Sequence, residues 1–166
     1  MNAIFQRRSI RTYTEPDVSD EQIRTILHAA MMAPSANDSR PWQFLVIKEK
    51  DRLAQLCDVS PYAKMTKDAS VAIIVCGDLS LERSKGFWVQ DCSAATQNML
   101  LEATQQGLGA VWLGVYPLEE RVEFLRNICQ LPQHIVPLCI VPIGHPAQSP
   151  ETPDRYDATR IHHEIW

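Results

Sequence analysis

The chain has 166 residues, a formal charge of −4 and a hydrophobic fraction of 45%, all of which fit one globular domain spanning residues 1–166. The acidic balance argues against nucleic-acid binding, which requires a basic stripe, and no apolar run approaches the ~20 residues of a membrane-spanning helix. The start of the chain has no secretory signal pattern, and the five cysteines include no C-x-x-C pair. We therefore expect a cytoplasmic protein with reduced thiols and no metal site, membrane partner or nucleic-acid partner.

Helix and strand signals alternate along the first half of the chain. Residues 19–33 are the clearest helix, since Ser19 and Gln22 have capping-box spacing and Pro34 follows the apolar stripe. Residues 69–76 (ASVAIIVC) are apolar without interruption, which predicts a strand covered on both faces. Two weaker candidates lie between them, a short strand at 43–48 and a helix at 53–57.

The second half continues this alternation. A long helix is predicted at 88–106 and a strand at 109–115. A second helix is predicted to begin at Pro117 and to carry Leu118, Val122 and Leu125, and a last strand is predicted at 135–143. Gly107 stops the long helix. Pro137 and Pro142 place the last strand near a sheet edge or at a bulge, because proline cannot donate a ladder hydrogen bond. Periodicity alone leaves an α+β and an α/β fold open.

Residues 144–166 form a tail of unusual composition. It holds three prolines and no helical stripe, yet it ends in Ile165 and Trp166. One interpretation is a disordered end, as is common for termini. The other is an extended arm that buries its apolar end on a partner subunit.

The segment Arg7-Arg8-Ser9-Ile10-Arg11 places three guanidinium groups and a hydroxyl within five positions. Guanidinium groups suit a phosphate dianion, because they form charge-assisted and often bidentate hydrogen bonds. The alternative is a solvated basic turn. The cluster stands out in a chain that is acidic overall, which favours a phosphate site.

Residues 34–42 are a loop bounded by Pro34 and Pro41 and rich in short polar side chains. Such a loop is stiff and offers hydrogen-bonding groups with little bulk, so a flat ligand could lie against it. The alternative is an ordinary connection between a helix and a strand.

Residues 107–114 (GLGAVWLG) do not match a dinucleotide-binding fingerprint. The third glycine of G-x-G-x-x-G would fall on Trp112, and these glycines follow a helix and lead into a strand, which reverses the required order. Gly114 instead lets a ligand approach the backbone closely. Because no catalytic triad, paired-carboxylate site or histidine cluster accompanies the arginines, a cofactor is expected to perform the chemistry.

The chain resembles the nitroreductase family of FMN-dependent oxidoreductases almost from end to end. Four features occur in the family's order: Arg7-Arg8-Ser9-x-Arg11, Pro34-Ser35-Ala36 followed by Pro41-Trp42-x-Phe44, Gly107-Leu108-Gly109 through Trp112-Leu113-Gly114, and Gly144-His145-Pro146 before the tail that ends in Trp166. The resemblance implies an α+β fold with a central mixed, mostly antiparallel sheet packed between helices and a C-terminal tail exchanged between subunits. It also implies a homodimer with two identical FMN sites, each built from both subunits.

The resemblance assigns the cofactor contacts. Arg7, Arg8, Ser9, Arg11 and the tail residue Arg155 would hold the phosphate. The loop Pro34, Ser35, Ala36, Asn37 and Asp38 would come from the partner subunit and lie against the flavin. Trp112, Leu113 and Gly114 would lie near the reactive ring nitrogen, with backbone groups of the last two facing it. No side chain is expected to be catalytic, since the chemistry takes place on the flavin.

Two positions depart from the family's pattern. Asp38 stands where Asn is common, and Arg40 where Gln is common, so either Asn37 or Asp38 could face the flavin. A carboxylate there would oppose flavin reduction unless Arg40 pairs with it.

The implied activity has two stages: NADH or NADPH reduces the flavin, and a nitroaromatic, quinone or similar acceptor then reoxidises it. Trp42 and residues 79–86 are candidates for shaping the acceptor pocket. The alternative interpretations are that Trp42 packs in the core and that residues 79–86 form a solvated loop. A non-catalytic FMN carrier and a dimer without any cofactor are the alternatives.

Overall fold

The computed structural model describes residues 2–166. Its helices are α1 Ala3–Gln6, α2 Asp20–Met31, α3 Lys50–Gln55, α4 Trp88–Gln105 and α5 Glu119–Cys129. Its strands are β1 Tyr13–Thr14, β2 Trp42–Ile47, β3 Val71–Asp78, β4 Gly109–Ala110, β5 Leu113–Gly114 and β6 Ile135–Pro146. Short 3-10 turns, η1 to η5, lie at Ala36–Asp38, Leu56–Asp58, Lys64–Asp68, Leu79–Leu81 and Ala158–Arg160.

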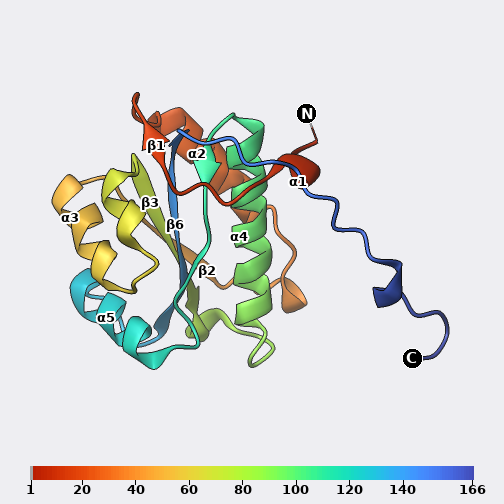
Figure 1. Cartoon of the computed structure of the whole chain (residues 1–166). Helices are drawn as coiled ribbons and strands as arrows, with labels where there is room; N and C mark the ends of the chain where they lie inside the picture. The colour runs from red at the N-terminus through yellow and green to blue at the C-terminus, as the bar shows by residue number, and fades with distance from the viewer. Residues whose placement is uncertain (1) are drawn as a thin grey trace.

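The strands of the described residues form one six-stranded sheet. β1, β6, β3 and β2 are neighbours in that order, and β4 and β5 also pair with β6. These strand pairs are antiparallel, while an isolated bridge between Ser9 and Ala110 is parallel. Helices lie on both faces of the sheet, as Figure 1 shows. The predicted α+β fold, a mixed and mostly antiparallel sheet between helices, is therefore confirmed.

Strand β3 lies at the centre of the core, and all eight of its residues are buried. Val71, Ile73 and Val75 pack with residues of α2 and α4, whereas the alternate residues Ala72 and Ile74 pack with residues of α3 and α5. Because successive side chains of a strand point to opposite faces, an unbroken apolar run serves a sheet that is covered on both sides. The prediction for this strand is confirmed.

The helix predictions differ from the structure mainly at the helix starts. In α2, Ser19 Oγ accepts a hydrogen bond from Gln22 N at 3.2 Å, which confirms the capping box. Helix α3 begins at Lys50, three residues before the predicted start. Helix α5 begins at Glu119 and not at Pro117, so that its first turn carries two acidic side chains at the positive end of the helix dipole.

Strand β6 is a central strand, so its predicted position near an edge is wrong. It lies between β3 on one side and β1, β4 and β5 on the other. The alternative prediction of a bulge is right: Val75 pairs with Cys139 but Cys76 pairs with Pro137, which leaves Leu138 as the extra residue. A bulge accommodates a proline that cannot donate to the ladder.

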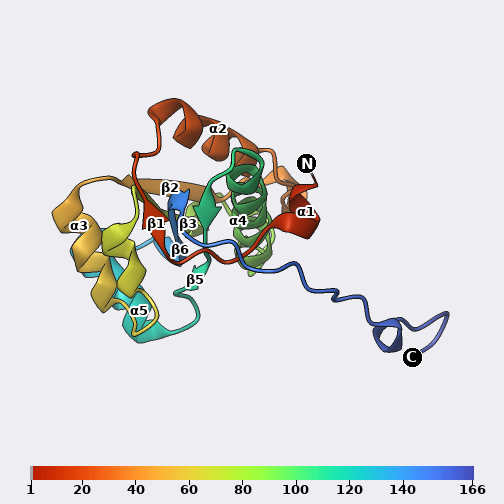
Figure 2. The same cartoon turned by 45° about the horizontal axis from the view of Figure 1, so that its top comes forward.

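The predicted strand at 109–115 is interrupted. Ala110 pairs with Ile143 in β4 and Leu113 pairs with Ile140 in β5, and the residues between them are unpaired. Continuing the register of β4 places Pro142 opposite this gap. Proline has no N–H to donate, so the ladder cannot continue there. The interruption leaves a short irregular edge beside α4 (Figure 2).

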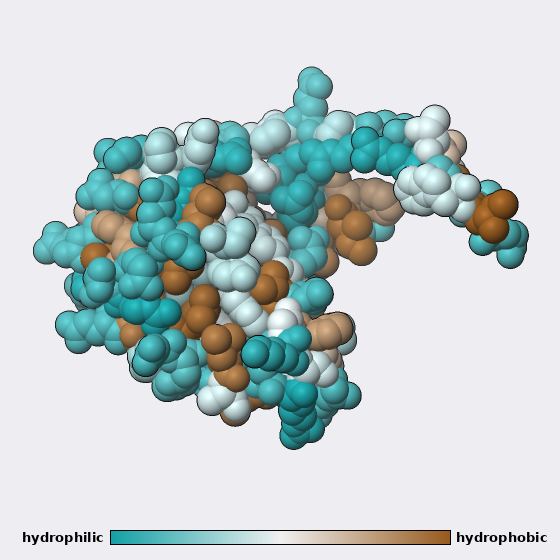
Figure 3. Space-filling model, turned by 90° about the horizontal axis from the view of Figure 1, so that it is seen from below, coloured by the Kyte–Doolittle hydropathy of each residue, from teal (hydrophilic) through white to brown (hydrophobic). Residues whose placement is uncertain are grey.

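The tail leaves the body of the protein. All residues from 149 to 166 are exposed, and the side chain of Trp166 is 99% exposed. Figure 3 shows the tail as a projecting arm, with hydrophobic atoms exposed at its end and on the body beside it. Among residues 2–166, no helix is both long enough and apolar enough to cross a membrane.

Candidate functional site

The arginine-rich segment is fastened to the edge strand β4. Arg7 directly follows α1, Ser9 forms a bridge with Ala110, and Ile10 N donates to Ala110 O at 3.0 Å. Arg8 spans from this segment to the tail, because its Nε donates to Glu151 O at 2.9 Å. The segment and the start of the tail therefore run together along the same edge of the sheet.

A cavity of about 390 Å³ lies between α1 and the tail. Arg7, Arg8 and Arg155 line it, so the structure brings together three of the predicted phosphate ligands. The pKa of the Arg7 guanidinium is lowered, first by burial and then by the positive charges of Arg155 and Arg8. Asp154 lines the same cavity, so the lining combines three cations with one carboxylate. The remaining excess of positive charge favours a bound anion.

Two predicted phosphate ligands, Ser9 and Arg11, are not part of the lining of this cavity. Ser9 is half-buried beside Arg8, and Arg11 is exposed. Arg11 uses its backbone N–H to donate to Gln148 Oε1 at 2.9 Å. Neither residue lines the cavity between α1 and the tail.

The β4–β5 edge continues from the arginine segment towards α5. Trp112 is half-buried and packs against the core, Leu113 is buried, and Gly114 is exposed. A Cβ atom added at Gly114 would meet nothing within 4 Å, so a flat ligand could lie directly against this backbone. Gly114 O accepts a hydrogen bond from Arg121 Nη1 at 2.8 Å. Arg121 Nε is buried without a hydrogen-bond partner in the described chain.

The loop of residues 34–40 is held by an internal network. Asp38 and Arg40 form a bidentate ion pair at 2.6 and 2.7 Å, which lowers the pKa of Asp38 and compensates its negative charge. Asn37 Nδ2 donates to Ser84 Oγ at 2.6 Å. Asn37 and Asp38 are both exposed.

The loop of residues 34–40 and the arginine cavity lie towards opposite ends of α4. Asp91 of α4 bonds to Ala36 of the loop, whereas Thr104 lines a cavity of about 290 Å³ together with Arg8. The rise of an α-helix places Asp91 and Thr104 about 20 Å apart. The loop also lies on the other side of α4 from β4 in both Figure 1 and Figure 2. One protomer therefore does not bring the two predicted halves of the site together.

The residues of this edge fit FMN by their chemistry. The three guanidinium groups of the cavity suit a terminal phosphate monoester, and the open backbone at Gly114 suits a flat ring. Trp42 is 7% exposed and belongs to the core cluster, so its core-packing interpretation is the right one. Residues 79–86 are not only a solvated loop, because Ser84 and Arg83 both contact Asn37.

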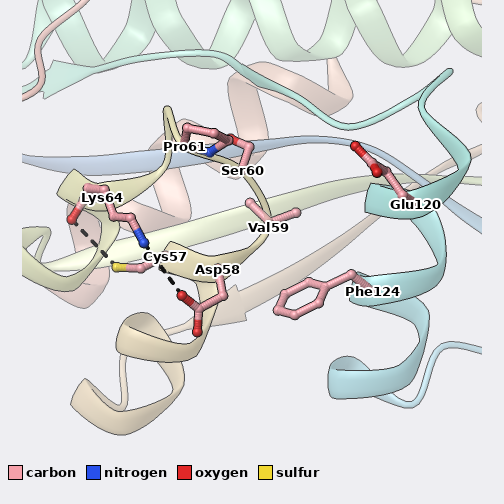
Figure 4. A pocket seen from close by; sticks show the side chains of 8 residues that line it. All are labelled: Cys57, Asp58, Val59, Ser60, Pro61, Lys64, Glu120 and Phe124. Carbon is pink, nitrogen blue, oxygen red and sulfur yellow. Dashed lines mark hydrogen bonds and ion pairs between the residues drawn. The ribbon is translucent and has the colours of Figure 1, made fainter.

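Sequence reasoning missed a third cavity, of about 480 Å³, between η2, the segment after it and α5 (Figure 4). Its lining combines the ion pair of Lys64 and Asp58, at 3.5 Å, with Glu120 and Phe124 of α5. Glu120 precedes Arg121, the residue that bonds to Gly114. The sequence signal was weak, because these residues are scattered between a loop and a helix.

Comparison with known proteins identifies the relatives of this chain. The family model described as "Nitroreductase family" matches residues 4–65 and 58–145. A protein of Methanothermobacter thermautotrophicus named "Putative NADH dehydrogenase/NAD(P)H nitroreductase" is 54% identical over 166 residues, covering 100% of this chain and 87% of the relative.

Two solved structures are similar in fold as well as in sequence. A "Putative NADH Oxidase" from Clostridium acetobutylicum has a TM-score of 0.96 and 41% identity, covering 99% of both chains. A "putative nitroreductase in complex with fmn" from Desulfovibrio desulfuricans has a TM-score of 0.86 and 36% identity, covering 99% of this chain and 95% of that one. The chain belongs to the nitroreductase family and is an oxidoreductase of the nitroreductase type.

Proposed function

We propose that the protein binds FMN and transfers hydride from NADH or NADPH, through the flavin, to a nitroaromatic, a quinone or a similar organic acceptor in the cytoplasm. The observation that carries this proposal is the cavity in which Arg7, Arg8 and Arg155 meet, at the start of an edge that leads to the open backbone of Gly114. The Desulfovibrio relative, named as an FMN complex, supports the choice of cofactor.

Each residue of this edge has a distinct role in the proposal. Arg7 and Arg155 hold the phosphate as charged donors, while Arg8 also ties the tail to the site through Glu151 O. Ser9 and Arg11 flank the phosphate and ribityl chain, and Trp112, Leu113 and Gly114 form the backbone edge along the ring. Bound FMN would supply the redox chemistry by taking two electrons and releasing them to the acceptor. Arg121 donates a hydrogen bond to the Gly114 carbonyl oxygen and thereby fixes the orientation of this peptide group. The orientation of the peptide group in turn sets the direction in which the neighbouring N–H groups point.

The proposed site is shared between two subunits. The loop Pro34, Ser35, Ala36, Asn37 and Asp38 is separated from the arginines by the length of α4 and lies on its other side, so a second copy would supply it to the flavin. A homodimer with two identical sites satisfies this requirement by symmetry. The Asp38–Arg40 pair lets the loop approach a reduced, anionic flavin with little net charge.

The tail supports the same assembly. Ile4 and Phe5 of α1 are each 68% exposed, and Ile165 and Trp166 at the end of the tail are 84% and 99% exposed. Apolar surface exposed in this way is typical of a protein–protein interface. We expect Trp166→Ala combined with Ile165→Ala to weaken the dimer and FMN binding together, because a ligand of the assembled state stabilises that state. Sedimentation and flavin fluorescence on the same samples measure both. A monomeric wild-type protein that binds FMN tightly would contradict the shared site.

The function is tested by the flavin and its turnover. Denatured protein should release FMN and not FAD, since the arginines suit a terminal phosphate and no adenosine-binding fingerprint exists. FMN-loaded protein should oxidise NADH or NADPH with a quinone or a nitroaromatic as acceptor. An FMN-loaded protein that shows no turnover in such a screen would be the non-catalytic carrier. Protein that takes up no flavin from excess FMN would refute the proposal.

A further inference from the structure

A buried carboxyl group joins α4 to the loop of residues 34–40. Asp91 is 5% exposed, although its neighbours on the buried face of α4 are mostly apolar. Its two oxygens accept hydrogen bonds from Ala36 N at 2.9 Å and from Ser39 Oγ at 3.3 Å. Both donors belong to the loop, so the hydrogen bonds of this side chain bind the loop to the helix.

The loop adopts a backbone conformation that needs such support. Asn37, Asp38 and Arg40 have φ angles of 51°, 52° and 46°, in the left-handed region that residues with a Cβ adopt rarely. Residues in this region persist only when their surroundings determine them strongly, and they cluster at binding sites. Asp91 holds this stretch at two points, because Ala36 directly precedes it and Ser39 lies within it.

Other bonds of the loop are weaker candidates for this role. Ser35 Oγ accepts from Arg40 N at 3.0 Å, and the Asp38–Arg40 pair is about two-thirds exposed on both sides. These contacts stay within the loop, so they shape it without placing it on the protein. Ser84 and Arg83, which also bond to Asn37, belong to another loop, most of which is exposed. Asp91 is the buried link between the loop and a long helix.

We propose that Asp91 is a positioning residue for the flavin site of the partner subunit. It would not touch the cofactor; it holds the loop in its left-handed conformation before the flavin binds, so that binding does not have to order the loop. The inference rests on the proposed function, because it assumes that the loop meets an FMN. It goes further, because it assigns a role across the interface to a buried residue in the first turn of α4.

Matched substitutions separate positioning from simple loss of folding. Asp91→Ala removes both bonds and should weaken FMN binding by at least roughly tenfold. Asp91→Asn should restore most of the affinity, because its amide can accept from Ala36 N and donate to Ser39 Oγ. Ser39→Ala removes only the longer bond and should have a smaller effect in the same direction, and it keeps the test available if Asp91→Ala does not fold.

The readout is the affinity for FMN and for riboflavin in folded dimer. Since the loop is proposed to lie against the ring, Asp91→Ala should weaken the binding of both flavins by the same factor. Thermal unfolding is followed alongside. Variants with a lowered melting temperature but unchanged flavin affinity would show that Asp91 is only structural, and would overturn the inference.

A mixed dimer tests whether Asp91 acts across the interface. Two differently tagged copies are co-purified, one with Asp91→Ala and one with Arg7→Ala. If Asp91 serves the partner's site, one site of this dimer carries both changes and the other carries none, so about half of the sites bind FMN with wild-type affinity. If no site has wild-type affinity, Asp91 acts within its own protomer and the inference is wrong. Wild-type protein that binds no FMN would refute the proposed function instead.

Discussion

Replacing Arg7 by alanine is the sharpest test of the phosphate site. Arg7 lines the cavity between α1 and the tail, and burial together with Arg155 and Arg8 lowers its pKa. A hydrogen bond to a charged group contributes about 1.5–3 kcal/mol, so Arg7→Ala should weaken FMN binding about 10- to 150-fold. Without FMN, the substitution removes one of three neighbouring cations, so the melting temperature of the apoprotein should not fall.

The assay compares FMN with riboflavin, which lacks the phosphate. Quenching of flavin fluorescence gives both dissociation constants for wild type and for Arg7→Ala. The variant should lose affinity for FMN but bind riboflavin as the wild type does. Arg52→Ala on α3 is the matched control, because Arg52 is exposed and bonds only weakly to Gln55, at 3.5 Å. Equal losses for FMN and riboflavin would refute the assignment of Arg7 to the phosphate.

Three further predictions follow from local packing. Gly114→Val should abolish flavin binding while the melting temperature stays unchanged, because a side chain there meets open space in the protomer; retained binding would remove Gly114 from the site. Gly109→Ala should lower stability by about 1–3 kcal/mol in denaturant titration, since its Cβ would lie 2.5 Å from Ile10 Cγ2; unchanged stability would contradict this packing. Burial raises the pKa of Cys76 to about 12, so its reactive thiolate form is suppressed at pH 8. In alkylation mapped by mass spectrometry, the half-buried Cys129 should therefore be labelled before Cys76; earlier labelling of Cys76 would contradict its burial.

The sequence predicted the elements whose signal is local. The capping box of Ser19 and Gln22, the continuous apolar run of β3 and the long stripe of α4 each carry their pattern within a few turns or one strand. These patterns are visible in the sequence because burial of one face of an element selects apolar residues at a regular spacing. The proximity of Arg7 and Arg8 to Arg155 could not be predicted from a local pattern, since the tail lies far away along the chain. That prediction came from the family resemblance.

The errors arose where distant pairing decides the outcome. Pro137 and Pro142 suggested a position near an edge or at a bulge. The bulge is present, and together with a break in the neighbouring strand it lets β6 occupy the centre. The break itself depends on Pro142 opposing residues about thirty positions earlier in the chain. Asp91 gave no signal either, because one acid in an apolar helix face has meaning only when its loop partners are known.

The central position of β6 also has a consequence for how the sheet forms during folding. β6 pairs with β1, β3, β4 and β5, and β1 lies near the other end of the described residues. Without β6, the antiparallel pair of β2 and β3 has both of its edges open. Contacts between segments so distant in sequence close large loops and form slowly. The folding chain is therefore expected to remain an aggregation-prone intermediate until β6 has docked, and to complete its sheet in one late, cooperative step.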